Sequence, residues 1–160
     1  MLYVSAVTTE TKPNLFKRIL DSAKGLTEKG VVAGFPKGRL NTPHYENGES
    51  IIDVAIKNNY GMGVPRRDFM TPSSKKWMKF FSESLDIVRR DMLDNKLDSD
   101  KFLKSMGQKG SDIISKEIIA LDTPPNAPST IAKKGSSNPL VDTGAMSRST
   151  TWQIRRADKR

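Results

Sequence analysis

Cysteine is absent from the 160 residues of this chain, and histidine occurs only once, at His44. Without cysteine the chain can form neither a disulfide nor a thiolate-bound metal site, although this leaves the redox compartment open. No apolar run approaches the roughly 18 residues that a membrane-spanning helix requires, so we expect no membrane partner. The first twelve residues lack the basic start and long apolar stretch of a signal peptide, and we expect none.

Acidic residues are outnumbered by basic ones. The chain has 18 Asp and Glu against 27 Lys and Arg, which gives a net charge of +9 and an isoelectric point near 9.8. A basic excess informs on partners rather than on fold, and nucleic acid, an anionic membrane surface or an acidic protein surface would each fit it. A hydrophobic content of 36% is enough for one domain with a single core.

The spacing of hydrophobic residues predicts both strands and helices. Expected strands cover residues 2–7, 31–35 and 150–154. Expected helices cover residues 13–25, 51–56, 72–95, 99–121 and 129–134. Residues 58–70 are expected to be irregular, because glycine and proline interrupt them. This order predicts an α+β fold, in which a small antiparallel sheet packs against several helices, one of them long, within a single domain of residues 1–160.

Capping residues mark several of the expected helix starts. Ser50 and Asp53 have the spacing of a capping box. Thr71 precedes Pro72, which indicates a hydroxyl N-cap followed by a proline in the first turn. Asp98 or the serine after it can cap the next helix.

His44 is the first candidate for a catalytic residue. It lies in a loop rich in proline and asparagine, and no strand–turn–helix nucleophile elbow accompanies it. We therefore interpret it as an ordinary loop histidine. The carboxylate pairs Asp91/Asp94 and Asp98/Asp100 lie where helices end or begin, and helix capping explains them better than acid–base catalysis.

Cofactor and metal sites are not expected either. The chain has no histidine pair and no Asp- and Asn-rich loop with metal-ligand spacing. Gly61 and Gly63 are too close together for a phosphate-binding loop. Trp77, Phe80 and Phe81 could stack on nucleic-acid bases, but at helical spacing we interpret them as core residues. The sequence therefore predicts a protein that is not an enzyme and that binds no cofactor.

A proline-rich connection precedes the last expected strand. Residues 123–144 contain four prolines and two glycines. Proline fixes φ, so such a segment is stiff and loses less entropy when it docks. We expect an assembly arm that is mobile in the free protein and ordered in an assembly, with an ordinary connector as the alternative. The candidate interface residues of this arm are Pro124, Pro125, Asn126, Pro128, Thr130, Asp142, Thr143 and Gly144.

Three motif regions follow one another along the chain. The first is Val32-Ala33-Gly34-Phe35-Pro36. The second contains Asn58-Asn59-Tyr60-Gly61, Val64-Pro65-Arg66, and Phe69-Met70 before Pro72. The third contains Pro124-Pro125-Asn126-Ala127-Pro128-Ser129-Thr130-Ile131, Lys133-Lys134-Gly135, Pro139-Leu140-Val141-Asp142-Thr143-Gly144 and Ser149. In this order they resemble the bacteriophage neck and tail-completion proteins, also called the virion morphogenesis or putative tail-component family.

The resemblance covers residues 30–154 and departs from the family pattern at two positions. Asn59 stands where the family often has glutamate, and Asp68 stands where it often has a second proline. The resemblance implies a structural virion protein of the head–tail junction, made in the host cytoplasm. It implies a homo-oligomeric ring of about six or twelve copies around the DNA channel. Neighbouring portal or adaptor proteins and tail proteins would be its partners, and no catalytic residues are implied.

The basic excess has a use in such a ring, because duplex DNA carries one negative charge per ~1.7 Å. The residues expected to contact channel DNA, without sequence specificity, or an acidic partner are Lys133, Lys134, Arg148, Arg155 and Arg156. The last two begin an expected basic tail, residues 155–160. Simple solvation of the surface is the alternative for all five. A small basic nucleic-acid-binding module is the alternative function, although no helix-turn-helix or zinc-finger pattern supports it. An enzyme, for example a toxin or nuclease, that uses His44 or an Asp cluster is a third reading.

Overall fold

The computed structural model describes residues 13–36, 45, 48–94 and 96–156. Its elements are α1 (Pro13–Thr27), β1 (Lys29–Gly34), α2 (Ile51–Tyr60), α3 (Met70–Leu93), α4 (Ser99–Ala120), α5 (Pro128–Lys134), α6 (Ala145–Arg148) and β2 (Thr151–Arg156). The prediction of an α+β fold with a small antiparallel sheet and one long helix is confirmed. The expected strand at residues 2–7, His44, and residues 157–160 lie outside the described residues.

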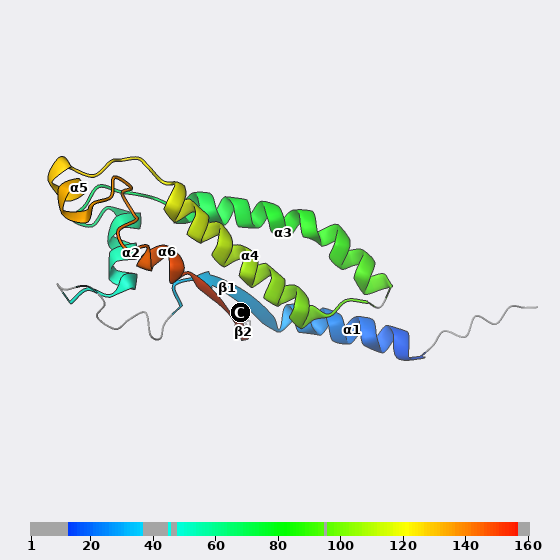
Figure 1. Cartoon of the computed structure of the whole chain (residues 1–160). Helices are drawn as coiled ribbons and strands as arrows, with labels where there is room; N and C mark the ends of the chain where they lie inside the picture. Colours follow the sequence, from blue (N-terminus) through cyan, green and yellow to red (C-terminus); the bar gives the residue numbers. More distant parts are fainter. Residues whose placement is uncertain (1–12, 37–44, 46–47, 95, 157–160) are drawn as a thin grey trace, which may run out of the picture.

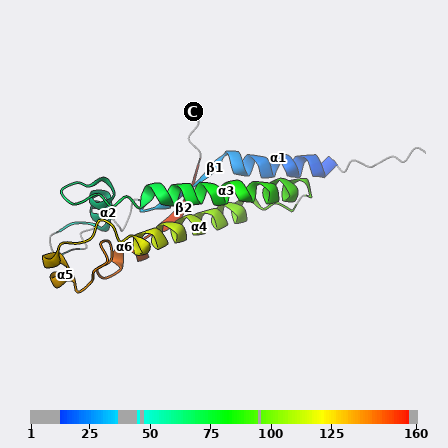
Figure 2. The ribbon, with the colours of Figure 1, turned by 90° about the horizontal axis from the view of Figure 1, so that it is seen from above.

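The molecule is elongated, with different elements at its two ends. Helices α3 and α4 form a long antiparallel hairpin, and α2, α5 and α6 gather at one end of it (Figure 1). Helix α1 lies at the opposite end, as the view from above also shows (Figure 2). Helix α4 is the central element, because it contacts α1, α3, α6 and both strands.

The sheet lies against one side of α4. Strand β1 pairs with β2 in antiparallel register, from Lys29 opposite Arg156 to Gly34 opposite Thr151. Two glycines of α4 allow neighbouring elements to approach closely, Gly107 on the side of β2 and Gly110 on the side of α3 and β1. A Cβ atom on Gly107 would lie 2.5 Å from the ring of Trp152, and one on Gly110 would lie 2.7 Å from Trp77. Although glycine weakens a helix by up to ~1 kcal/mol relative to alanine, here it lets two tryptophans pack on the helix backbone.

The start of α3 differs from the prediction. The helix begins at Met70, so Thr71 is inside it and is not its N-cap. Instead, Asp68 Oδ1 accepts a hydrogen bond from the Thr71 N–H at 2.9 Å, and Asn59 Oδ1 accepts one from the Met70 N–H at 3.1 Å. These two side chains satisfy donors that the first turn of a helix leaves without partners. Pro72 is tolerated because it still lies in that first turn.

Two further boundaries were wrong, whereas one cap is confirmed. Residues 58–60 are helical, because α2 continues to Tyr60 and ends at Gly61, whose φ of 74° is left-handed. Arg155 and Arg156 belong to β2 and do not begin a tail. The capping box of Ser50 and Asp53 is present: the Asp53 N–H donates to the Ser50 hydroxyl, and the Ser50 N–H donates to the Asp53 carboxylate.

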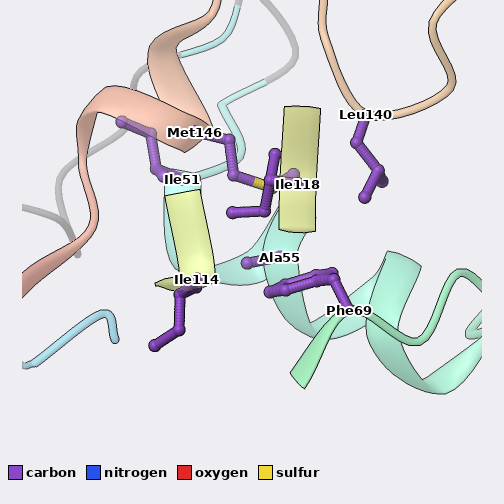
Figure 3. Packing of buried hydrophobic residues seen from close by; sticks show 7 residues of the cluster. All are labelled: Ile51, Ala55, Phe69, Ile114, Ile118, Leu140 and Met146. Carbon is purple, nitrogen blue, oxygen red and sulfur yellow. The ribbon is translucent and has the colours of Figure 1, made fainter. Parts of the chain in front are cut away.

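The hydrophobic core lies at the end of the molecule that contains α2 and α6. Figure 3 shows its buried cluster, which consists of Ile51, Ala55, Phe69, Ile114, Ile118, Leu140 and Met146. Phe35 adds an edge-to-face contact on Phe69, with ring centroids 6.3 Å apart. Four segments that are distant in sequence therefore meet in this cluster: α2, the start of α3, the end of α4, and residues 140–146.

Helix α3, by contrast, is poorly covered over its 24 residues. Only Ser73 and Val88 are buried within it. Trp77 packs on α4 as expected and donates its Nε1–H to the Met106 carbonyl at 3.0 Å. The interpretation of Phe81 as a core residue was wrong, because its side chain is exposed. Exposed apolar residues of α3 are Met78, Phe81, Leu85, Ile87 and Leu93.

Candidate functional site

An open groove of about 850 Å³ lies at the end of the molecule formed by α2, α5 and α6. Its walls come from α2, from the segment that connects α2 to α3, from α5, and from residues 139–146. The motif residues that line it are Asn58, Val64, Asn126, Thr130, Lys133, Lys134, Pro139, Leu140, Asp142 and Thr143. The second and third motif regions, which are far apart in sequence, are thus brought together in one concave surface.

Arg67 lines the groove and links two of its walls by hydrogen bonds. Its side chain is buried, and its guanidinium donates to the Pro124 carbonyl at 3.1 Å and to the Pro125 carbonyl at 3.4 Å. It also donates to the side-chain oxygens of Asn58 and Asn126, at 3.0 Å each. Since planar guanidinium groups present donors in fixed directions, this one residue orients the turn at residues 124–126 against α2.

A second set of hydrogen bonds holds the far side of the same segment. Asn138 Oδ1 accepts from the N–H groups of Leu140 and Val141, at 3.0 and 2.9 Å, and Asn138 Nδ2 donates to the Ile119 carbonyl at 2.8 Å. Asn126 Nδ2 donates to the Asn138 carbonyl at 3.3 Å, which links the two sets. Residues 123–144 therefore fold back on the domain, which differs from the mobile arm that we expected. They carry α5, which confirms the helix expected at residues 129–134.

The groove contains one buried cation, Arg67, together with the partly buried Lys134 and the carboxylates of Glu49 and Asp142. The four side-chain hydrogen bonds of Arg67 all end on neutral oxygens, and burial lowers the pKa of its guanidinium, which stays protonated. Burial also lowers the pKa of Lys134, while the nearby Asp142 opposes this shift. Burial raises the pKa of the Tyr45 phenol, and Asp142 and Glu49 add to the effect. Such a lining suits recognition of polar groups on a partner.

Four of the eight predicted interface residues line this groove, namely Asn126, Thr130, Asp142 and Thr143. The other four lie outside its lining. The Pro124 and Pro125 carbonyls accept from Arg67, and Pro128 begins α5. Gly144 adopts a φ of 75° before α6, and Thr143 Oγ1 accepts from the Ala145 N–H at 3.3 Å. Thr143 and Gly144 therefore form a turn that starts the short helix α6.

The five residues expected to contact DNA do not form one patch. Lys133 and Lys134 are in α5, where Lys134 Nζ donates to the Asn138 and Pro139 carbonyls, at 3.4 Å each. Arg148 donates to the Thr143 carbonyl at 2.7 Å. Arg155 and Arg156 lie at the far end of β2, well away from α5 (Figure 1).

Sequence reasoning missed Arg67. The motif region drew attention to its neighbour Arg66, which is exposed and pairs with Asp68 at 2.7 Å. Arginine is buried only where its donors are paired, and the side chains that pair with Arg67 lie 9 and 59 residues away in the sequence. Nothing local in the sequence indicates which of the two is buried.

Two other kinds of feature, a metal-binding cluster and a membrane-spanning helix, are absent from the described residues. No three acidic or histidine side chains there lie close enough together to hold a metal ion. Over the same ranges, none of the helices combines the length and apolarity that crossing a membrane requires. Comparisons of the chain with protein-family models, with curated proteins and with solved structures found no match. The resemblance to the phage family stays a prediction from the motifs.

Proposed function

We propose that this protein is a structural subunit of the bacteriophage head–tail junction, a neck or tail-completion protein that forms a ring around the DNA channel in the virion. The observation that carries the proposal is the uncovered apolar surface of α3. Five large apolar residues of this helix are exposed, and an α-helix of 24 residues is about 36 Å long. Three of the five, Met78, Phe81 and Leu85, are spaced by three and four positions and therefore share one side of the helix. An uncovered apolar surface of this kind marks a site that another protein covers.

The groove adds independent support. The motifs that resemble the phage family are separated by more than fifty residues in the sequence, between Arg67 and Pro124, yet they meet at one site through the bonds of Arg67. A motif set that builds one preformed concave surface is what a docking role requires, because a preorganised site loses little entropy on binding. The net charge of +9 further suits a ring through which DNA passes.

Mass measurement of the full chain tests the proposal. Light scattering over a range of protein and salt concentrations is expected to show self-association, with rings of about six or twelve copies, alone or when the portal and tail proteins of the same phage are added. Electron microscopy of particles should then place the protein at the junction. A protein that stays monomeric under all these conditions and never joins a particle would overturn the proposal.

A small nucleic-acid-binding module is the second candidate, favoured by one observation. Helix α4 carries four exposed lysines, Lys101, Lys104, Lys109 and Lys116. Two of the acidic residues of α4 are already paired elsewhere, Asp100 with Lys29 and Glu117 with Lys76. Binding to a short DNA duplex should distinguish the candidates. A ring that passes DNA is expected to bind weakly, whereas nanomolar affinity at physiological salt, with a steep fall as salt rises, would favour the module.

A further inference from the structure

Among the described residues, two separate apolar patches on α2 and α3 are uncovered. The first, which we call the α3 stripe, consists of Met78, Phe81 and Leu85, whose exposed fractions lie between 40% and 65%. The second, which we call the α2 knob, consists of Ile56, Tyr60, Met62 and Val64, exposed by 37% to 68%. Figure 1 shows α2 at one end of the molecule and α3 running away from that end.

The α3 stripe is continuous along the helix surface. Its three residues are spaced by three and four positions, so their side chains lie on one side of the helix. Phe81 is anchored at its inner edge by the ring of Phe102, with centroids 6.4 Å apart. The stripe therefore borders the interface between α3 and α4, and its position is fixed there by the contact between Phe81 and Phe102.

The α2 knob is a preformed protrusion. Ile56 and Tyr60 are one turn apart on α2, and the left-handed Gly61 then turns the chain back. The Met62 N–H donates to the Lys57 carbonyl at 2.9 Å, and the Arg67 N–H donates to the Asn58 carbonyl at 2.7 Å, which closes the loop. A protrusion that is already ordered loses little entropy when it docks.

The charges around the two patches differ. Residues 75–89 of α3 carry four cations and two carboxylates, an excess of two positive charges. Residues 49–68 around the knob carry three carboxylates and three cations, one of which is the buried Arg67, so their charges balance. Two copies that met stripe to stripe would bring like excess charges together, whereas a knob on a stripe would not.

The areas also match what an interface between copies needs. Side chains of these sizes and exposures leave on the order of 300–450 Å² of apolar surface at each patch, comparable to the largest patch on an ordinary monomer. With the charged residues around them, each copy would bury about 600–800 Å², which reaches the size of a specific interface.

We propose that the α2 knob of one copy docks on the α3 stripe of the next copy, so that the subunits join head to tail. The inference rests on the proposed function, because it assumes that the chain assembles with itself. A contact between two different patches leaves one patch free at each end of a dimer, and repetition of that contact generates a ring when the rotation closes. The geometry thus gives each of the two uncovered patches the same occupant, a second copy of this chain.

Complementation between two blocked variants tests this arrangement. The stripe variant is Met78→Glu with Leu85→Glu, and the knob variant is Tyr60→Glu with Met62→Glu. Each alone is expected to associate at least about 30-fold more weakly than the natural protein, because each loses one half of the contact. An equimolar mixture should form a 1:1 dimer and nothing larger, since each variant keeps one intact patch. The control Ile119→Glu, an exposed position outside both patches, should assemble normally.

Several results would overturn the inference and leave the proposed function intact. If the stripe variant stays monomeric, the knob variant assembles normally and the mixture forms no dimer, the copies meet stripe to stripe. If the natural protein assembles and neither variant changes this, another surface joins the copies. If the natural protein stays monomeric up to about 1 mM, the head-to-tail contact does not exist, and the proposed function then depends on the portal and tail proteins.

Cysteine cross-linking gives a second readout that does not depend on blocking the interface. Because the chain has no cysteine, a single Tyr60→Cys or Leu85→Cys substitution introduces the only thiol. Mild oxidation of the two variants together should give a mixed disulfide-linked dimer in preference to either homodimer. Equal amounts of all three dimers would show random collision and would contradict the proposal. Circular dichroism of every variant checks that the chains are folded. If a glutamate variant is unfolded, Leu85→Gln and Met62→Gln replace it as milder substitutions.

Discussion

The two halves of this elongated molecule differ in how much of their apolar surface is buried within the chain. At the end formed by α2, α5 and α6, a cluster of seven apolar residues is buried and Arg67 makes four side-chain hydrogen bonds. Along α3, only Ser73 and Val88 are buried. Because burial of apolar surface is the main source of folding free energy, stability is concentrated at the first end. The hairpin of α3 and α4 is left with apolar surface that a neighbour can cover.

Removal of a core side chain should show this difference most strongly. Ile118→Ala deletes part of a fully buried side chain and should lower the free energy of unfolding by about 2–5 kcal/mol. Leu85→Ala on α3 should lower it by less than about 1 kcal/mol, because that side chain is already half exposed. Denaturant titration of the dilute, monomeric protein measures both. Equal losses would show that α3 is as well packed as the core.

Arg67→Met is expected to have the next largest effect. The substitution leaves two backbone carbonyls and two amide oxygens without their donor, which should lower the free energy of unfolding by about 3 kcal/mol. Limited proteolysis should also become faster near residues 124–126. The matched control is Arg66→Met, which removes one exposed ion pair and should change stability by less than about 1 kcal/mol. Similar losses for the two variants would contradict the anchoring role of Arg67.

Gly107→Ala tests the packing between α4 and the sheet. The added Cβ atom would lie 2.5 Å from the Trp152 ring, so we expect a loss of about 1–3 kcal/mol, despite the better helix propensity of alanine. Gly30→Ala is the control, since no atom lies within 4 Å of its Cβ position. Thermal unfolding compares the two. A stabilised Gly107→Ala protein would show that α4 and β2 can move apart easily.

Asp68→Ala should have the smallest effect, about 1 kcal/mol, because it removes a cap at the start of α3. The bond from the Thr71 N–H lowers the pKa of Asp68, and Arg66 assists. A carboxyl whose pKa is lowered by folding stabilises the protein above its ordinary pKa of about 4, and this contribution disappears as the pH falls through the lower folded value.

The difference between natural protein and Asp68→Ala should therefore be full at pH 7 and should shrink in acid. Denaturant titrations at several pH values measure this trend. Asp86→Ala, which removes only an exposed ion pair with Arg89, should change stability by less than about 0.5 kcal/mol. A difference that stayed constant down to pH 2 would exclude the ionised carboxylate as the capping group.

Local signals in the sequence identified most of the elements. The periodicity of residues 99–121 predicted α4, and the spacing of Ser50 and Asp53 predicted a capping box that the structure contains. These predictions succeed because helix periodicity and capping depend on residues within one or two turns. The prediction of Thr71 as the cap was wrong because one of the side chains that cap α3 comes from outside this local range. Asn59, eleven residues before Met70, reaches the start of α3 only because the chain folds back on itself there.

The groove and its environment could not be predicted in this way. In the sequence, Arg66 and Arg67 are equivalent neighbours, and residues 123–144 were expected to form a stiff arm that is mobile in the free protein. The fold buries Arg67 against Asn58 and Asn126 and ties the arm to the domain. Likewise, the helical spacing of Trp77 and Phe81 could not indicate that the first packs on α4 while the second remains exposed.

The amino-acid sequence by itself determined which segments become helices and strands, the α+β class, and the basic charge of the surface, because all of these depend on composition or on neighbours a few residues away. The tertiary structure alone decided which arginine is buried, where the motif regions meet, and which apolar residues stay uncovered. Those outcomes depend on contacts between segments more than fifty residues apart, such as Arg67 with Asn126. Only the packing of the whole chain brings such partners within hydrogen-bonding distance.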